Sequence, residues 1–102
     1  MNKLIKWDVY EIGSVHNLLH GIKLRGKIRK FCLDNEINVL VENASDIENK
    51  VRFAVLSDAN VSEINKFIKT LFSDFKINLV MKDVENPVLS KLKINDTDRY
   101  KI

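Results

Sequence analysis

The sequence predicts a single α+β domain whose elements follow the order strand, helix, strand, strand, helix, strand. Four stretches alternate apolar and polar residues, which is the period of a half-buried strand, and two others repeat apolar residues at helical spacing. The composition, 45% hydrophobic and 30% charged, is typical of a globular protein, and no stretch rich in glycine, serine or proline divides the 102 residues. We therefore expect residues 1–102 to form one domain, with a core of about residues 4–94 and a tail of about residues 95–102.

The first two elements are a strand and a helix. Alternating apolar residues predict a strand over about residues 4–13, and an apolar stripe predicts a helix from Leu24 to about Asn35. Asn35 suits the end of this helix, because asparagine tolerates the left-handed conformation that often follows one. Gly26 lies inside the helix, where glycine is about 1 kcal/mol less favourable than alanine, and its presence favours close packing at that turn.

A hairpin and a second helix follow. Residues 37–41 and 51–55 alternate on either side of turn-forming residues, which predicts two strands joined as a hairpin. Asn60, followed three residues later by Glu63, forms a capping-box pattern. The apolar stripe after it predicts a helix that ends at about Phe72.

The last predicted elements are a strand over about residues 77–81 and a short edge strand within residues 88–94. The resulting order is that of the split βαβ, or ferredoxin-like, arrangement. We expect two helices packed on one face of a four- to five-stranded antiparallel sheet. Because enzymes, RNA-binding domains and regulatory domains all use this fold, function has to be argued from particular residues.

The distribution of charge favours an anionic ligand. The formal net charge is +3, and five of the cationic residues lie within residues 23–30, which contain no acid. Cys32 is the single cysteine, so neither an internal disulfide nor a cysteine-based metal site is expected. Charges interrupt the apolar residues at the N-terminus, and no apolar run is long enough to cross a bilayer. We expect a soluble, cytoplasmic protein.

Three short segments lie around the predicted first helix and its start. Residues 13–16 are Gly-Ser-Val-His and residues 21–25 are Gly-Ile-Lys-Leu-Arg, while residues 40–43 are Leu-Val-Glu-Asn. These segments resemble the Gly-x-Val-Gln, Gly-Val-x-Phe-Arg and Gly-aromatic-Val-Lys/Arg-Asn motifs of the acylphosphatase family. The interval from Arg25 to Asn43 is also the same as in that family. The similarity extends over most of the chain.

The resemblance implies a phosphate-binding site and a hydrolysis that needs no metal or cofactor. Arg25 would bind phosphoryl oxygens with its planar guanidinium, and Asn43 would position the attacking water with its side-chain amide. Backbone N–H groups of the loop that enters the helix would bind the same phosphoryl group. This loop consists of His20, Gly21, Ile22, Lys23, Leu24 and Arg25. The expected activity is cleavage of the carboxyl–phosphate bond of a small acyl phosphate by a monomer that also binds inorganic phosphate but no membrane and no nucleic acid.

The sequence departs from the family pattern in this loop. The segment between Val15 and Gly21 is about four residues longer, which adds well under about 1 kcal/mol of closure entropy. Catalysis is more sensitive, because donors must be held within about 0.5 Å of their working positions. We expect Leu18 and Leu19 to pack against the domain and order the loop, and a deletion that restores the family length to preserve the fold and raise turnover. The family glycine in the turn after Asn43 is absent.

Two other functions stay open on the sequence alone. A catalytically weak or inactive module of the same fold would bind a phosphate-bearing ligand or a macromolecular partner through this loop. A nucleic-acid binder has the least support, because it calls for exposed aromatic residues on the central strands. The third predicted strand offers only Phe53, and Trp7 and Tyr10 fit packing within the sheet better than base stacking. Lys23 and Arg25 are also compatible with the solvated face of a helix, and Asn43 with an ordinary turn residue.

Overall fold

The computed structural model of the protein describes residues 5–57, 59–85, 87–91 and 93–94. Its elements follow the predicted order: β1 (Trp7–Gly13), α1 (Leu24–Asp34), β2 (Val39–Asn43), β3 (Lys50–Leu56), α2 (Ser62–Leu71), β4 (Lys76–Val84), β5 (Pro87–Val88) and β6 (Lys93–Ile94). The predicted tail of about residues 95–102 lies outside the described residues. In the part of the chain that is described, no helix is long and apolar enough to cross a membrane.

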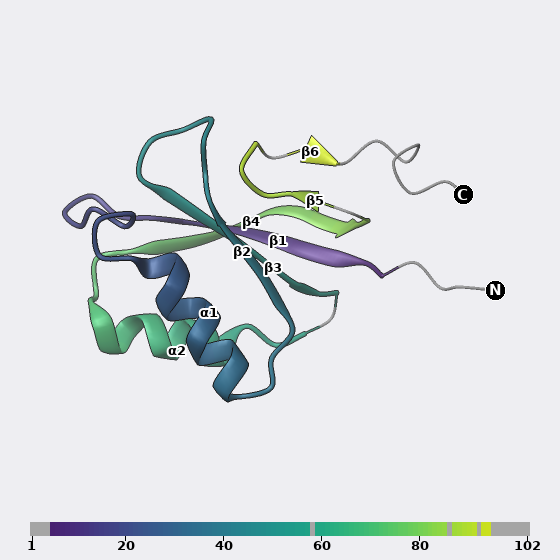
Figure 1. Ribbon diagram of the computed structural model, residues 1–102, viewed down its shortest axis with the longest axis horizontal. Helices are drawn as coiled ribbons and strands as arrows, with labels where there is room; N and C mark the ends of the chain where they lie inside the picture. The colour runs from purple at the N-terminus through teal and green to yellow at the C-terminus, as the bar shows by residue number, and fades with distance from the viewer. Residues whose placement is uncertain (1–4, 58, 86, 92, 95–102) are drawn as a thin grey trace.

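The four long strands form one sheet in the order β2-β3-β1-β4, and every neighbouring pair is antiparallel. β1 and β2 run in the same direction, because each is antiparallel to β3, and α1 connects them. Both helices cover the same face of the sheet (Figure 1). The predicted ferredoxin-like α+β fold is confirmed.

The main core lies between the sheet and the two helices. Its buried members are Ile12, Leu19, Leu24, Ile28, Cys32, Val51, Phe53, Val55, Ile64 and Ile68. Each large apolar side chain buried in this way contributes about 1.5–3 kcal/mol to the free energy of unfolding. Phe31 of α1 stacks on Phe67 of α2 with 4.4 Å between the ring centroids, which joins the two helices. The burial of Cys32 raises the pKa of its thiol.

The second face of the sheet is covered by the segment that contains β5 and β6. Leu89 is buried there against Val9 of β1 and Ala54 of β3. β5 and β6 pair with each other in a separate two-stranded sheet, so the prediction of an added edge strand within residues 88–94 was wrong. A short segment that crosses over the sheet buries apolar surface more completely than one that extends its edge.

Two expectations about α1 are corrected. Asn35 ends the helix with a φ of −109°, and the left-handed residue is Glu36, with a φ of 57°. The backbone explains the difference, because the N–H of Ile37 bonds the carbonyl of Cys32 at 2.8 Å and that of Glu36 bonds the carbonyl of Leu33 at 3.4 Å. This is the Schellman motif, in which the residue after the C-cap is left-handed. Gly26 is exposed, and a Cβ built on it meets no atom within 4 Å, so the turn that contains it is open and not closely packed.

The predicted second helix and fourth strand are present, with local differences. α2 begins at Ser62 with Val61 as its N-cap residue and without a side-chain cap, so the expected capping box is wrong. The side chain of Asn60 instead accepts a 2.8 Å hydrogen bond from the N–H of Ser62, two residues further on, as in an Asx turn. The pairing of β4 with β1 contains a register shift between Val9 and Tyr10 of β1. Leu79 lies opposite Tyr10 on the helix side, whereas Met81 lies opposite Val9 on the other face. The bulge thus breaks the alternation that predicted one common face.

Candidate functional site

The predicted site residues lie at one end of the sheet. β1 ends at Gly13, which pairs with Lys50, the first residue of β3. β2 ends at Asn43, which pairs with Val51, the second residue of β3. α1 begins at the same end, because it follows β1 and returns along the sheet. The long loop that connects β1 to α1 extends beyond this end of the sheet (Figure 1). The connectivity therefore brings Arg25, the loop and Asn43 to the same end of the molecule.

The N-terminus of α1 carries positive charge and has no side-chain cap. Lys23 is the N-cap residue, in the left-handed conformation with a φ of 59°, and the first turn contains no acidic residue. Lys23, Arg25 and Lys27 are exposed. Cations at this end of a helix are unfavourable by about 0.3–1 kcal/mol each, because the macrodipole is positive there. In the described ranges Arg25 has neither an ion pair nor a side-chain hydrogen bond, so its guanidinium remains available to an anion.

The predicted phosphate-binding loop uses three of its N–H groups internally. These groups close turns within the loop by donating hydrogen bonds to carbonyl groups. Ile22 donates to Leu18 at 3.0 Å, Lys23 to His20 at 3.2 Å, and Leu24 to Leu19 at 3.1 Å. The expectation that all the loop N–H groups converge on one phosphoryl group is therefore wrong for these three. The hydrogen bonds of the described residues leave the N–H groups of Arg25 and Gly26 free at the start of α1.

The side chains of the same loop divide into two groups. Leu24 is buried in the main core and Ile22 packs against it, so these two residues anchor the loop and are not available to a ligand. His20, Gly21 and Lys23 are exposed. The His20 ring bonds the carbonyl of Lys50 with a distance of 2.8 Å, and Nε2 is the donor because a carbonyl oxygen only accepts.

Asn43 is the last residue of β2 and faces the helices. Partly buried residues alternate with exposed ones along β2, so Asn43 shares a face with Val39 and Val41, which pack against the main core. Its side-chain oxygen, Oδ1, is buried and has no hydrogen-bond partner among the described residues. A buried acceptor without a donor costs about 1–3 kcal/mol. A donor that enters from outside the protein would remove this cost.

Asn49 and Asp74 hold the long loop, and sequence reasoning missed both. The side chain of Asn49 makes three hydrogen bonds to backbone groups of the loop, between 2.7 and 3.1 Å in length. Asp74 accepts one from the hydroxyl of Ser14 at 3.0 Å and one from the N–H of His16 at 2.6 Å. These bonds, the one from His16 above all, lower the pKa of the Asp74 carboxyl although partial desolvation acts in the opposite direction. An asparagine in a turn where a glycine is expected was the one available signal.

The expectation that both leucines of the loop pack down holds for one of them. Leu19 is fully buried in the main core, whereas 73% of Leu18 is exposed. Val15, at the start of the loop, is 84% exposed. Leu19 therefore anchors the loop together with Ile22 and the polar contacts of His20, Asn49 and Asp74, while Leu18 does not.

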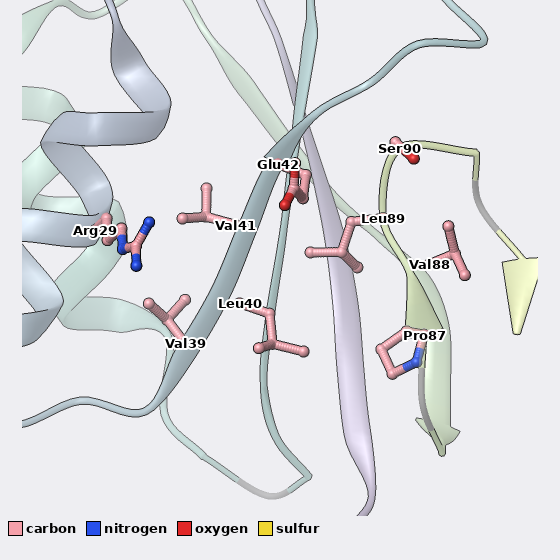
Figure 2. Close-up of a pocket in the computed structure, with 9 residues that line it drawn as sticks. All are labelled: Arg29, Val39, Leu40, Val41, Glu42, Pro87, Val88, Leu89 and Ser90. Carbon is pink, nitrogen blue, oxygen red and sulfur yellow. The ribbon is translucent and has the colours of Figure 1, made fainter. Parts of the chain in front are cut away.

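Three surface depressions are found among the described residues, and one of them includes a residue of the predicted phosphate-binding loop. Figure 2 shows one at the outer edge of β2, where Val39 and Val41 point towards α1 while Leu40 and Leu89 lie on the other side of the strand. Two others are lined by residues 44–49 with His20, and by residues of α2 with Tyr10. None of these three depressions is lined by Arg25 or Asn43.

Comparisons of the chain with protein-family models, with curated proteins and with solved structures give no significant match. The fold and the geometry of the site therefore carry the functional argument.

Proposed function

We propose that the protein is a slow, metal-free hydrolase of small acyl phosphates. The observation that carries this proposal is the buried side-chain oxygen of Asn43, which has no donor in the described part of the chain. This oxygen has almost no accessible surface, so a water molecule would bind it only after a small movement of the surrounding groups. A hydrolase must hold its attacking water in a fixed orientation, and such a bond would do so. The resemblance of the Arg25 and Asn43 segments to the acylphosphatase motifs supports the same assignment.

The charge at the start of α1 supports an anionic substrate. The helix N-terminus offers the free N–H groups of Arg25 and Gly26, and the guanidinium of Arg25 adds a permanently charged fork. Lys23 and Lys27 raise the local potential further. An anion bound here would relieve the repulsion between these cations and the helix dipole. Binding of a phosphoryl group is therefore expected to stabilise the fold as well.

In the proposed reaction the water oxygen attacks phosphorus while the bond between phosphorus and the carboxyl oxygen breaks. The products are a carboxylate and inorganic phosphate, and the surplus proton passes to solvent. Because such transition states are loose, the protein acts mainly by positioning groups and stabilising charge. Arg25 binds the phosphoryl oxygens, and Asn43 accepts a hydrogen bond from the attacking water.

A second function, the binding of a phosphate-bearing ligand without turnover, is favoured by one observation. The N–H groups of Ile22, Lys23 and Leu24 bond carbonyl groups of their own loop, so fewer donors surround the phosphoryl group than a fully formed cradle would supply. Fewer donors stabilise the transition state less. The two functions share Arg25 and differ in whether Asn43 contributes to a chemical step.

The test compares wild-type protein with Arg25→Ala and with Arg29→Ala, which removes another exposed arginine one turn further along α1. Hydrolysis of benzoyl phosphate is followed with EDTA present, and inorganic phosphate binding is measured by titration calorimetry. We expect measurable turnover in wild type, a phosphate Kd at least about tenfold higher in Arg25→Ala, and little change in Arg29→Ala. Arg25→Lys should not restore binding, because an ammonium group lacks the planar two-point contact.

Each outcome separates the two functions. Turnover that depends on Arg25 supports the hydrolase. Phosphate binding that depends on Arg25 without any turnover supports the binding module instead. If Arg25→Ala and Arg29→Ala change turnover and the phosphate Kd equally, the net charge of the helix matters and Arg25 forms no specific site. That result would overturn both proposed functions.

A further inference from the structure

Asn49 combines an unusual backbone with a fully engaged side chain. It directly precedes β3 in the turn that follows β2, and its φ is 56°. Glycine adopts this conformation most easily, and asparagine is one of the few other residues that tolerate it. Asn49 therefore takes a backbone conformation suited to glycine while adding a side chain with donors and an acceptor.

The side chain of Asn49 binds the long loop at three points. Oδ1 accepts the N–H of Leu19 at 2.7 Å, while Nδ2 donates to the carbonyl groups of Ser14 at 3.1 Å and Asn17 at 2.8 Å. The reversed amide would place its NH2 group against an N–H and its oxygen against two carbonyls, so the orientation is fixed by its partners. All three partners belong to the β1–α1 loop, the element that is longer than the resemblance predicts.

One of these contacts continues to the start of α1. The N–H of Leu19 binds Asn49, and the carbonyl of the same residue accepts the N–H of Leu24, the first residue of α1, at 3.1 Å. The buried side chain of Leu19 fixes this residue between the two bonds. Arg25 follows Leu24 directly. A displacement of Leu19 therefore moves the first turn of α1, which carries the free N–H groups and the guanidinium.

We propose that Asn49 is a positioning residue for the phosphoryl site, which it orients through Leu19 and the first turn of α1. This inference rests on the proposed function, since it assigns Asn49 to the site formed by Arg25 and Asn43. The other polar contacts of the loop act elsewhere: Asp74 binds its first residues, and His20 reaches the carbonyl of Lys50. We expect the buried side chain of Leu19 to preserve the fold when Asn49 is replaced. The backbone of Leu19, without its bond to Asn49, can then shift together with the first turn of α1.

The experiment uses Asn49→Gly, which keeps a residue suited to the positive φ and removes the three side-chain bonds. Glu36→Gly is the matched control, because Glu36 also has a positive φ, of 57°, and lies beyond the opposite end of α1. Both variants and wild type are checked by circular dichroism and thermal unfolding. Binding of inorganic phosphate, steady-state hydrolysis of benzoyl phosphate and amide exchange at Leu19 and Leu24 are then measured.

We expect Asn49→Gly to keep the fold, to raise the phosphate Kd and the KM together by about tenfold, and to change kcat by less than about threefold. Amide exchange at Leu19 and Leu24 should accelerate by about tenfold, while Glu36→Gly matches wild type in each measurement. In wild type, saturating phosphate should slow exchange at the same two amides, because the ligand and the hydrogen bonds of Asn49 stabilise the same loop conformation.

Three results would overturn the inference. If Asn49→Gly is folded and binds phosphate as tightly as wild type, the hydrogen bonds of Asn49 do not act on the site. Loss of the fold in Asn49→Gly, with Glu36→Gly intact, would make Asn49 a structural residue. A wild-type protein that neither binds phosphate nor hydrolyses benzoyl phosphate would reject the proposed function itself, and with it the site that Asn49 is inferred to orient.

Discussion

Arg52 holds Asp46 with two hydrogen bonds, from Nη1 to Oδ1 at 2.7 Å and from Nη2 to Oδ2 at 3.2 Å. Its other groups bind the carboxylate of Glu11 and the carbonyl of Leu89, each at 2.9 Å. The side chain of Arg52 is 2% exposed, so this contact fixes the turn between β2 and β3 from the face opposite the helices. The turn that presents Asn49 to the loop is therefore itself anchored by a buried charge. The hydrogen bonds from Arg52 lower the pKa of Asp46.

Arg52→Ala should lower the free energy of unfolding by about 1–3 kcal/mol, because it removes the donors of Glu11, 17% exposed, and of the Leu89 carbonyl, whereas water can replace them at Asp46, which is 38% exposed. Lys30→Ala is the control, since it breaks the exposed pair between Lys30 and Asp34, with side chains 78% and 58% exposed. That loss should stay below about 0.5 kcal/mol. Urea unfolding of the two variants measures both values. Equal losses would show that burial does not strengthen the Arg52 contacts.

Asn43→Ala should change activity and stability in opposite directions. Loss of the water-binding oxygen should lower kcat on the order of 100-fold, while the phosphate Kd changes by less than about threefold. The same substitution removes a buried acceptor that has no partner among the described residues, so the free energy of unfolding should stay equal or rise. Steady-state kinetics and urea unfolding test the two halves. A parallel loss of kcat and phosphate binding would place Asn43 in substrate binding.

Leu19→Ala and Leu18→Ala should differ sharply. Leu19 is fully buried, so its truncation should cost about 2–5 kcal/mol, whereas Leu18 is 73% exposed and its truncation should cost less than about 0.5 kcal/mol. For the same reason a deletion of residues 17–20, expected from the sequence to preserve the fold, should now destabilise it. Thermal unfolding of the three variants gives the comparison. A deletion variant as stable as wild type would contradict the anchoring role of Leu19.

Gly26→Ala should stabilise the protein. Gly26 lies in α1, and a Cβ at this position meets no neighbouring atom within 4 Å. Alanine is about 1 kcal/mol more favourable than glycine in a helix interior, which corresponds to roughly 4–8 °C in Tm for a domain of this size. Gly26 is in the first turn of α1, where the gain is smaller, so the rise in Tm should stay below that range. Thermal unfolding followed by circular dichroism is sufficient. A lower Tm would mean that the turn is less open than the structure shows.

Acid should weaken the attachment of the long loop through Asp74. Its carboxyl has a pKa lowered in the folded state, chiefly by the N–H of His16. The unfolded chain therefore binds this proton more readily, and the stabilisation is complete above the ordinary carboxyl pKa of about 3.9 and is lost as the pH falls through the lower folded value. The Tm difference between wild type and Asp74→Asn should be largest near pH 7 and shrink as the pH falls below the ordinary carboxyl pKa. A difference that persists in acid would show that the charge of Asp74 is not involved.

The sequence by itself determined the order of the elements and the end of the sheet at which the candidate residues lie. The helical stripe of α1 and the alternation in the hairpin are local periodicities, so each could be recognised within its own segment. The βαβ connectivity then places Arg25 and Asn43 at the same end, because β1 and β2 must run in the same direction. The order of residue types along the chain was sufficient to predict these elements and their connectivity.

Tertiary structure alone decided how the long loop is held and which of its groups remain free. The contacts of Asn49 with Leu19 and of Asp74 with Ser14 join residues 30 and 60 positions apart, so no local pattern encodes them. The N–H groups that the loop uses within its own turns follow from the same attachments. Backbone groups carry no sequence identity, and their pairing depends on where distant side chains fix the chain in space.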